Sequence, residues 1–451
     1  MAWAYFGILF VTILFWFLIV KRSMVEGMWI AFIILLTISG MWGNAFGYVL
    51  KSSKNSILLT IGLFMFFSKI LEKTGVLEDC LDILVAIVGR FAAGSGYVAV
   101  IASAFMGTLS GSVPGNVAAT GCITIPAMKR SGYTPELAAG ICVAGSSLGC
   151  VVPPSTLIIL SFGFLNEMFP DTYIFSDFWT FMYYIAAIYI AHRLITVFIL
   201  CKAYKIQPMD KADLPDLKTA FKRGWASLLL PLVVFLPFWI NNTFNATFVT
   251  DRLGKGGASS FSSSLLIIAP CIAILYTMLV AKDKKTVTPS FFVESMRSSI
   301  KGFAPLMFMV VGGYSIGELF TQVGVMDMML RDLQSINIPF WAVATIMPLV
   351  LGAMGCFFDG LSILTLLGPL VLTVSVSVGI SPWLSAAMMP GVIHSMCHMT
   401  PPYAPGLLMA IGMAEADFKE TCKQMFVWIG GHYAITVLLY FGIIPIIGSI
   451  R

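Results

Sequence analysis

Residues 110–155 have the sequence SGSVPGNVAATGCITIPAMKRSGYTPELAAGICVAGSSLGCVVPPS, and this stretch decides the fold. Its Gly/Ser-rich start breaks an apolar run at 97–127, and its Pro-Pro end breaks a second apolar run at 135–165. Non-helical backbone at membrane depth is tolerated only where protein buries it or where it lines a cavity. We therefore expect a hairpin over 97–127 that enters and leaves the membrane on one side. A helix interrupted mid-membrane should follow over 135–165.

The composition identifies lipid as the solvent of this chain. Of 451 residues only 49 are charged, 58% are hydrophobic and the mean hydropathy is +0.92, whereas about a quarter of the residues of a soluble domain are charged. The chain is therefore predicted to be an all-α polytopic protein of the lipid bilayer. Its net charge of +5, without a dense basic run, argues against nucleic acid as a partner. Nine Cys without a C-x-x-C pair are expected to be buried apolar residues, not disulfides.

Two hairpins and ten crossings account for the apolar stretches. The second hairpin is expected at 340–376, broken between Gly355 and Gly360. The crossings are expected at 2–20, 27–43, 56–71, 135–165, 178–200, 225–240, 262–280, 303–320, 382–413 and 425–447.

The basic residues support this topology. Lys21-Arg22 follow the first stretch and no basic residue precedes it, which predicts a spanning helix with an external N-terminus. Counted along the ten crossings, twenty basic residues fall inside and six outside, with Arg193 within a span. This bias follows the positive-inside rule and places both termini outside.

The two halves of the chain share an order of landmarks. A spacing of 249 residues separates Gly75 from Gly324, Ser110 from Asp359 and Gly111 from Gly360, and 248 separates the two Pro-Pro pairs. GYTP at 132–135 and GISP at 379–382 mark corresponding turns, of which only the first follows a basic pair, Lys129-Arg130. We interpret this as an inverted repeat, the usual architecture of secondary transporters. The alternative is that Pro and Gly are only kinks whose spacing coincides.

The repeat divides the chain into five segments. We expect scaffold helices at 1–55, a first repeat at 56–200, inter-repeat scaffold helices and cytoplasmic loops at 201–302, a second repeat at 303–424 and a C-terminal helix at 425–451. The second interrupted helix is expected at 382–413. Amphipathic helices at 76–89 and 326–336 either brace the hairpins or are plain interfacial helices.

The stretch at 110–155 resembles the first signature of the large membrane subunits of TRAP (tripartite ATP-independent periplasmic) transporters, and GCFFDG at 355–360 with HMTPP at 398–402 resembles the second. The resemblance implies a sodium-driven, elevator-type importer of the ion-transporter superfamily in the bacterial inner membrane. It also implies a small four-helix membrane subunit and a periplasmic solute-binding protein as partners. The SGS-x-x-x-N form is similar to the TAXI branch of the family, and GCFFDG to its DctM branch, so the branch and the substrate stay open.

The candidate sodium ligands lie where each hairpin tip meets each helix break. A hard monovalent cation needs several oxygens, which unwound backbone and small polar side chains can provide. In the first half they are Ser110, Gly111, Ser112, Asn116, Pro153 and Ser155, and in the second half Gly355, Asp359, Gly360, Thr400 and Pro401. Asp359 is the strongest, because it is the one acid in the interior of these elements and a lone carboxylate within a membrane is costly unless it is paired. The alternative roles are an N-cap for Asp359 and satisfaction of helix ends for the serines.

Histidines precede the second break. His394, Cys397 and His398 share one helical face, which suggests either a soft-metal site or, as we favour, contact with the solute. The candidate solute contacts are His394, His398, Pro154 and Pro402. Glu318 and Arg193, also within spans, are expected to pair or to reach the interface, with docking of the small subunit as an alternative for Arg193.

The sequence therefore predicts a permease subunit that couples inward sodium flow to uptake of a small carboxylated solute. The alternative is a stand-alone carrier of the same superfamily that needs no binding protein. A membrane-embedded enzyme, which would rest on His394 and His398, is disfavoured because the chain lacks an H-E-x-x-H motif and a phosphate-binding glycine loop.

Overall fold

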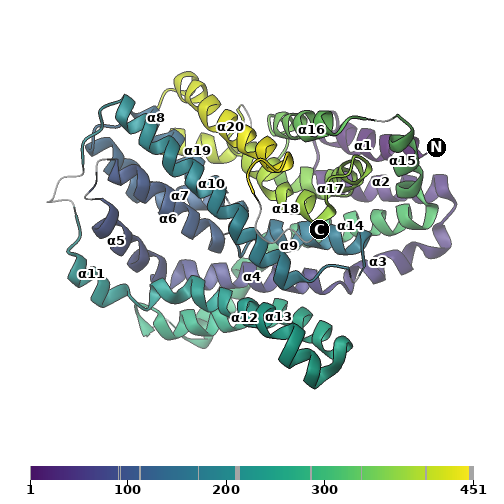
Figure 1. Cartoon of the computed structure of the whole chain (residues 1–451), viewed down its shortest axis with the longest axis horizontal. Helices are drawn as coiled ribbons and strands as arrows, with labels where there is room; N and C mark the ends of the chain where they lie inside the picture. The colour runs from purple at the N-terminus through teal and green to yellow at the C-terminus, as the bar shows by residue number, and fades with distance from the viewer. Residues whose placement is uncertain are drawn as a thin grey trace.

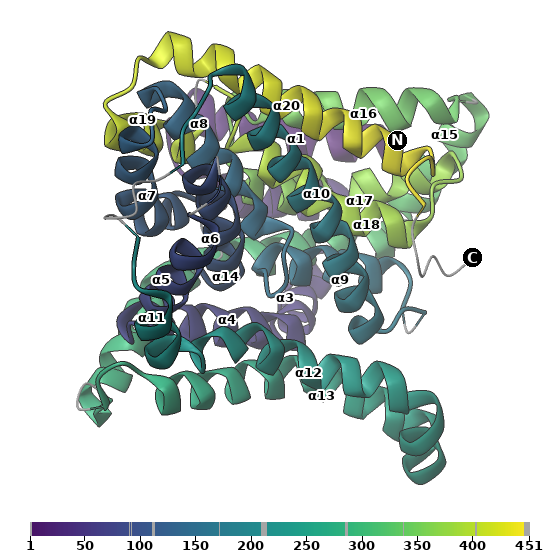
Figure 2. The same cartoon turned by 60° about the vertical axis from the view of Figure 1, so that its left-hand side comes forward.

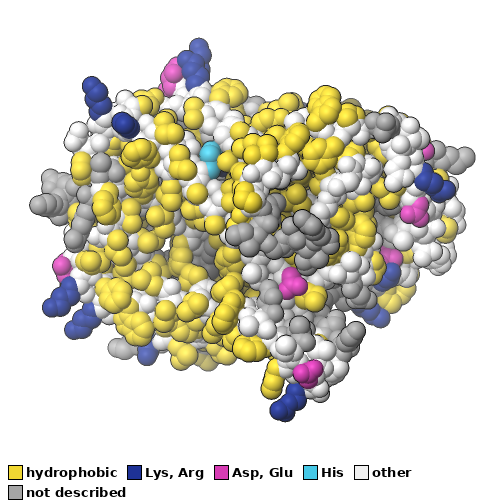
Figure 3. Space-filling model, in the orientation of Figure 1, with side chains coloured by type: hydrophobic (Ala, Val, Ile, Leu, Met, Phe, Trp, Pro, Cys, Tyr) yellow, Lys and Arg dark blue, Asp and Glu magenta, His cyan; other side chains and the backbone are white. Residues whose placement is uncertain are grey.

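The computed structural model describes residues 2–89, 91, 93–110, 113–170, 172–208, 214–284, 287–336, 338–401 and 404–445. These residues form helices and no strand (Figure 1), which confirms the prediction of an all-α protein. By length and apolarity four helices can cross a membrane, and up to seven spans result if each of three bent pairs is one span. Hydrophobic side chains cover most of the face seen in Figure 3, and Lys and Arg lie toward its periphery.

The elements follow the same order in both halves of the chain. The first half contains α4 (Ser56–Lys73), α5 (Val76–Val88), α6 (Gly94–Ser110), α7 (Val113–Arg130), α8 (Pro135–Ser146), η2 (Ser147–Cys150), α9 (Thr156–Met168) and α10 (Phe175–Ala203). The second contains α14 (Pro289–Val323), α15 (Val325–Ile336), α16 (Phe340–Met354), α17 (Gly360–Ser377), α18 (Pro382–Met389), η7 (Pro390–Ser395), α19 (Pro405–Ala414) and α20 (Phe418–Tyr440). Thus α6–α7 and α16–α17 are the two expected hairpins, and α8–α9 and α18–α19 are the two interrupted helices.

The repeat extends to backbone conformation. Gly75 and Gly324, between the first two helices of each half, both have φ of +71°. Gly132 and Gly379, in the turns before the interrupted helices, have φ of +88° and +84°. Only glycine adopts this left-handed region at little cost, so spacing coincidence does not explain the matched landmarks.

The half-helices of the two interrupted helices pair across the repeats. The first hairpin packs on α8 and on α19, whereas the second packs on α18 and on α9. Helices α8 and α19 also pack on each other, as do α18 and α9, and η2 contacts η7 between them. The two interrupted helices therefore run antiparallel and cross at their breaks, as an inverted repeat requires.

The remaining helices form a framework around this centre. Helices α1 (Ala2–Leu18), α2 (Met24–Ser39) and α3 (Ala45–Ser53) pack along α14 or on one another, and α13 (Thr250–Val280) packs on α4 and on α12 (Leu230–Phe244). Figure 2 shows α12 and α13 side by side along one edge of the molecule. Two short helices, α3 and α11 (Leu217–Gly224), were not expected from the sequence. Their lengths of 9 and 8 residues are too short for a clear apolar period.

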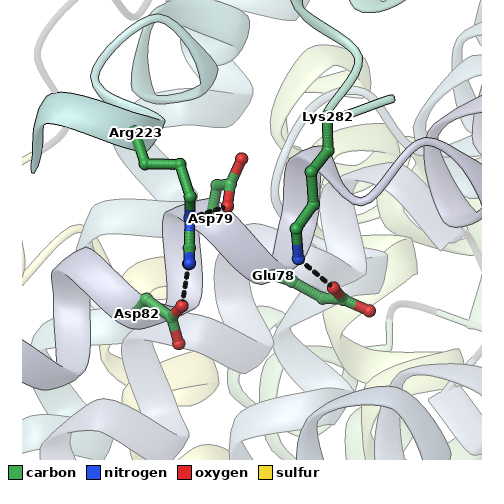
Figure 4. A network of polar contacts seen from close by, with 5 residues as sticks. All are labelled: Glu78, Asp79, Asp82, Arg223 and Lys282. Carbon is green, nitrogen blue, oxygen red and sulfur yellow. Dashed lines mark hydrogen bonds and ion pairs between the residues drawn. The ribbon is translucent and has the colours of Figure 1, made fainter. Parts of the chain in front are cut away.

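Ion pairs connect residues that the sequence assigns to one side of the membrane. On the side predicted to be internal, Arg223 Nε of α11 lies 2.6 Å from Asp79 Oδ1 of α5 and the same guanidinium contacts Asp82, while Lys282 Nζ lies 3.1 Å from Glu78 Oε2 (Figure 4). The sorting of charges into two sets fits these contacts. The absolute direction of the termini and the five-segment division stay predictions.

Candidate ion and solute site

Asn116 connects the first hairpin to the first interrupted helix. It lies in the first turns of α7 and is fully buried. Its Nδ2 donates to the carbonyl of Ser103 in α6 at 2.7 Å and to that of Ser146 in α8 at 3.2 Å. Its Oδ1 is also buried and has no hydrogen-bond partner among the described residues. A buried unpaired amide oxygen is costly, so the position is suited to a cation.

Three hydroxyls belong to residues that hydrogen-bond with Asn116, and they were not predicted from the sequence. Ser103 Oγ lies 3.0 Å from Thr120 Oγ1 and 3.3 Å from Ser146 Oγ, and all three residues are fully buried. Thr120 is one helical turn after Asn116, so the i, i+4 spacing was the available signal. Glycines allow the close approach, because a Cβ on Gly107 would lie within 3 Å of the backbone of Gly149.

The other candidate sodium ligands of the first half differ in how far the structure describes them. Ser110 ends α6 but its side chain is not described, and Gly111 and Ser112 lie outside the described residues. Pro153 lies buried in the break. Ser155 caps α9, its Oγ accepting from the Leu157 amide at 3.3 Å. This hydroxyl therefore has the helix-end role that was the alternative interpretation.

Asp359 lies at the N-terminus of α17, at the tip of the second hairpin. Its Oδ1 accepts from the amides of Leu361 and Ser362 at 3.0 and 3.1 Å, and its Oδ2 accepts from Ser362 Oγ. The N-cap role is thus present, and it leaves carboxylate lone pairs for further ligands.

The second tip packs directly on the second interrupted helix. A Cβ on Gly355 would lie 2.8 Å from Cys397 Sγ, and one on Gly360 would lie 2.6 Å from His394 Nδ1. Thr400 Oγ1 donates to the Met396 carbonyl at 2.7 Å. Pro401 is the last described residue of this break, and Pro402 lies outside the described residues. The tip and the break therefore meet in the second half, and in the first half the described hairpin residues Gly107 and Asn116 contact the residues just before the break.

His394 and His398 form a buried pair between the hairpins. Their Nε2 atoms are 3.2 Å apart, and each Nδ1 is buried without a partner among the described residues. His394 faces Gly360 of the second hairpin, and His398 Nδ1 would lie 3.6 Å from a Cβ on Gly406. The described residues contain no group of three His, Cys, Asp or Glu side chains placed to hold a metal ion, so they give the soft-metal hypothesis no support. Pro154, in the first break, is buried.

Two charged residues within spans have different surroundings. Glu318 of α14 pairs with Lys51 of α3 at 2.7 Å, as one of the sequence interpretations expected. Arg193 of α10 is fully buried and hydrogen-bonded inside the protein, so it neither reaches the membrane interface nor is exposed for docking a subunit.

Two hairpin tips that meet two broken helices across an antiparallel crossing define a secondary membrane transporter, not an enzyme. The chain matches the family model of the "Tripartite ATP-independent periplasmic transporter, DctM component" over residues 6–447, and it belongs to this family. It is accordingly a TRAP large permease, a subunit of a solute importer that depends on a binding protein and includes a small membrane subunit.

Relatives of known name support the family, and a solved structure supports the fold. The chain is 23% identical, over 85% of its length and 83% of the relative's, to the C4-dicarboxylate TRAP transporter large permease protein DctM of Vibrio cholerae. It is 21% identical to the sialic acid large permease SiaM of the same organism, over 87% and 86%. The structure of Neisseria gonorrhoeae MtrF, from a class of antimetabolite efflux pumps, is similar in fold, with a TM-score of 0.67 at 14% identity over 90% of this chain and 86% of that one.

Proposed function

We propose that this permease imports a small carboxylated solute with sodium ions, by movement of the hairpins and interrupted helices against the framework. The observation that carries the proposal is the meeting of each hairpin tip with a helix break around buried oxygens that lack partners or keep free lone pairs. Freed backbone and half-helix ends at such a crossing are the groups that bind coupling ions in secondary transporters.

One sodium ion would bind beside Asn116. Its unpartnered Oδ1 and the hydroxyls of Ser103, Thr120 and Ser146 are the described side-chain ligands available there. Carbonyls of the break would complete the oxygens that a hard cation needs. The cluster contains no carboxylate, so binding of a single positive charge avoids the cost of burying several anions.

A second sodium ion would bind at Asp359, together with carbonyls at Gly355, Thr400 and Pro401. The carboxylate already accepts three hydrogen bonds, which orient it at the tip. A monovalent cation at its free lone pairs would offset the cost of a half-buried negative charge.

The solute would contact the histidine pair. Each histidine presents a buried Nδ1 without a described partner, and one Nε2–H···Nε2 bond leaves one of these two nitrogens as a donor. A donor at this place suits a carboxylate. The relatives named for C4-dicarboxylate and for sialic acid both take carboxylated solutes, which supports this class.

The test is sodium-driven uptake in proteoliposomes that contain the permease, its small subunit and its binding protein. We expect uptake to require an inward sodium gradient, and Asp359→Asn to lower it at least tenfold while the protein stays folded, because Asn also caps helices. Asp417→Asn is the matched control, since Asp417 caps α20 in the same way, accepting from the Glu420 amide at 2.8 Å.

Two results would contradict parts of this proposal. If uptake by the Asp359→Asn variant depended on sodium as it does in the wild type, Asp359 would not be a ligand of the second ion. Full uptake by the permease without binding protein would favour the stand-alone carrier.

A further inference from the structure

Arg193 is a buried cation whose five donor positions are all used by uncharged groups. Its side chain is fully buried at the middle of α10. Nε donates to the Ala144 carbonyl at 3.1 Å. Nη1 contacts His192 Nδ1 at 3.2 Å and the Trp428 carbonyl at 3.4 Å, and Nη2 contacts His432 Nδ1 at 2.9 Å and Met399 Sδ at 3.3 Å.

The charge of this guanidinium is not neutralised locally. No carboxylate lies within ion-pair distance of Arg193 in the described part of the chain. A guanidinium always carries its proton. His432 Nε2 lies 3.0 Å from the Gly391 carbonyl, so the neutral tautomer that donates there accepts from Arg193 at Nδ1. The partial negative charge at the C-terminus of α8, where Ala144 lies, offsets only part of the positive charge.

The position of Arg193 joins it to both candidate ion sites. Ala144 is two residues before Ser146, whose carbonyl accepts from Asn116. Met399 directly precedes Thr400 in the second break. The cation therefore contacts the backbone carbonyl of Ala144 just before the first break and the side chain of Met399 in the second.

We propose that Arg193 is an internal counter-charge that disfavours sodium binding in the empty transporter and favours the anionic solute, so that ions bind fully only with the solute. This inference rests on the proposed function. It assigns control of the ion affinity of the empty transporter to a residue that needs no contact with either ligand, because Coulomb interactions act through the poorly screened interior.

The size of the effect follows from electrostatics. Two unit charges about 10 Å apart at an effective dielectric constant of about 20 change an affinity roughly tenfold. A purely structural loosening would weaken sodium binding. Removal of the counter-charge should instead tighten it, which makes the direction of the change diagnostic.

The experiment measures sodium binding to the purified permease with its small subunit, by thermal shift and calorimetry, with choline as the control cation and no solute. The charge-keeping Arg193→Lys and the neutral Arg193→Gln both lose hydrogen bonds, but only the second loses the charge. We expect Arg193→Gln to bind sodium about tenfold more tightly than Arg193→Lys.

A second pair of variants avoids replacing Arg193. Met399 is buried beside Nη2 of Arg193, so Met399→Glu places a carboxylate against the guanidinium. Met399→Gln has nearly the same shape as Met399→Glu but carries no charge. We expect the Glu variant to bind sodium more tightly than the Gln variant by a similar factor. His432→Ala, which removes a contact but no charge, should not tighten sodium binding.

The outcomes separate this inference from the proposed function. Equal sodium affinity within both charge pairs, or weaker binding in Arg193→Gln and Met399→Glu, overturns the inference while the sodium site stands. No sodium-specific signal in the wild type contradicts the proposed function and this inference together.

Discussion

Asn116 connects, at the scale of one residue, the packing of the first hairpin with the proposed ion binding. Its amide nitrogen holds carbonyls of α6 and α8 at 2.7 and 3.2 Å, while its buried oxygen stays free. The same side chain therefore stabilises the hairpin and leaves an acceptor at the break. An orphaned acceptor of this kind is retained where a ligand satisfies it.

Replacement of Asn116 by Ala should lower both stability and sodium response. Two buried carbonyls lose their donor, which costs about 1–3 kcal/mol. The gain in thermal unfolding midpoint on adding sodium should also shrink. Thr124→Ala is the control, because Thr124 is buried two turns further along the same helix. Its hydroxyl donates to the Thr120 carbonyl at 2.9 Å. A normal sodium response in Asn116→Ala would contradict a ligand role for Asn116.

The sequence predicted Asn116 and Asp359 because each is a polar side chain at a break in an apolar run, and because the tips repeat at a fixed spacing. It did not indicate Ser103 or Ser146, which are single small polar residues in apolar helices and meet Asn116 only after the chain folds. Nor did it indicate that Arg193 is fully buried, since its neutral partners come from α8 and α20, far apart in sequence. Contacts between distant elements leave no local pattern.

Helix α5 is held at the scale of elements by charge. Its acidic face meets Arg223 of α11 and Lys282 after α13 (Figure 4). Gly224 allows α11 to approach, because a Cβ there would lie 2.9 Å from the backbone oxygen of Asp79. Asp79 is 2% exposed, unlike its neighbours in the network. No ion pair to another helix is found in the described part of α15, its counterpart in the second half, so the two amphipathic helices are anchored differently.

Arg223→Gln should lower stability by about 1–3 kcal/mol, because it leaves the buried carboxylate of Asp79 with a weaker partner. Asp79→Asn combined with Arg223→Gln should recover part of the lost stability. A double-mutant cycle of the two positions, measured from unfolding midpoints, would give the coupling energy. Lys423→Gln breaks an exposed pair with Glu420 and should change stability by less than about 1 kcal/mol. Additive effects of the Arg223 and Asp79 changes would show that the pair is not coupled.

The whole molecule consists of an antiparallel crossing of interrupted helices and a framework, and glycines allow close contact between the two at α14. A Cβ on Gly163 of α9 would clash with the Tyr314 hydroxyl of α14, and one on Gly317 of α14 would clash with the Glu167 carboxylate of α9. A Cβ on Gly313 of α14 would lie 2.9 Å from Thr365 of α17. Smooth, close surfaces of this kind allow two bodies to pass each other, whereas the ion pairs of α5 and α11 hold their helices together.

Cross-links should therefore have opposite effects at these two places. A Glu167→Cys, Gly317→Cys pair joins α9 to α14, and after oxidation we expect uptake to stop, because the crossing could no longer move against the framework. An Asp82→Cys, Arg223→Cys pair joins α5 to α11 and should leave at least half of the uptake, since those helices stay together during transport. Reduction should restore the first variant. Because the chain has nine cysteines, oxidised wild type is the necessary baseline. Undiminished uptake with α9 fixed to α14 would exclude relative movement at this interface, and the elevator mechanism with it.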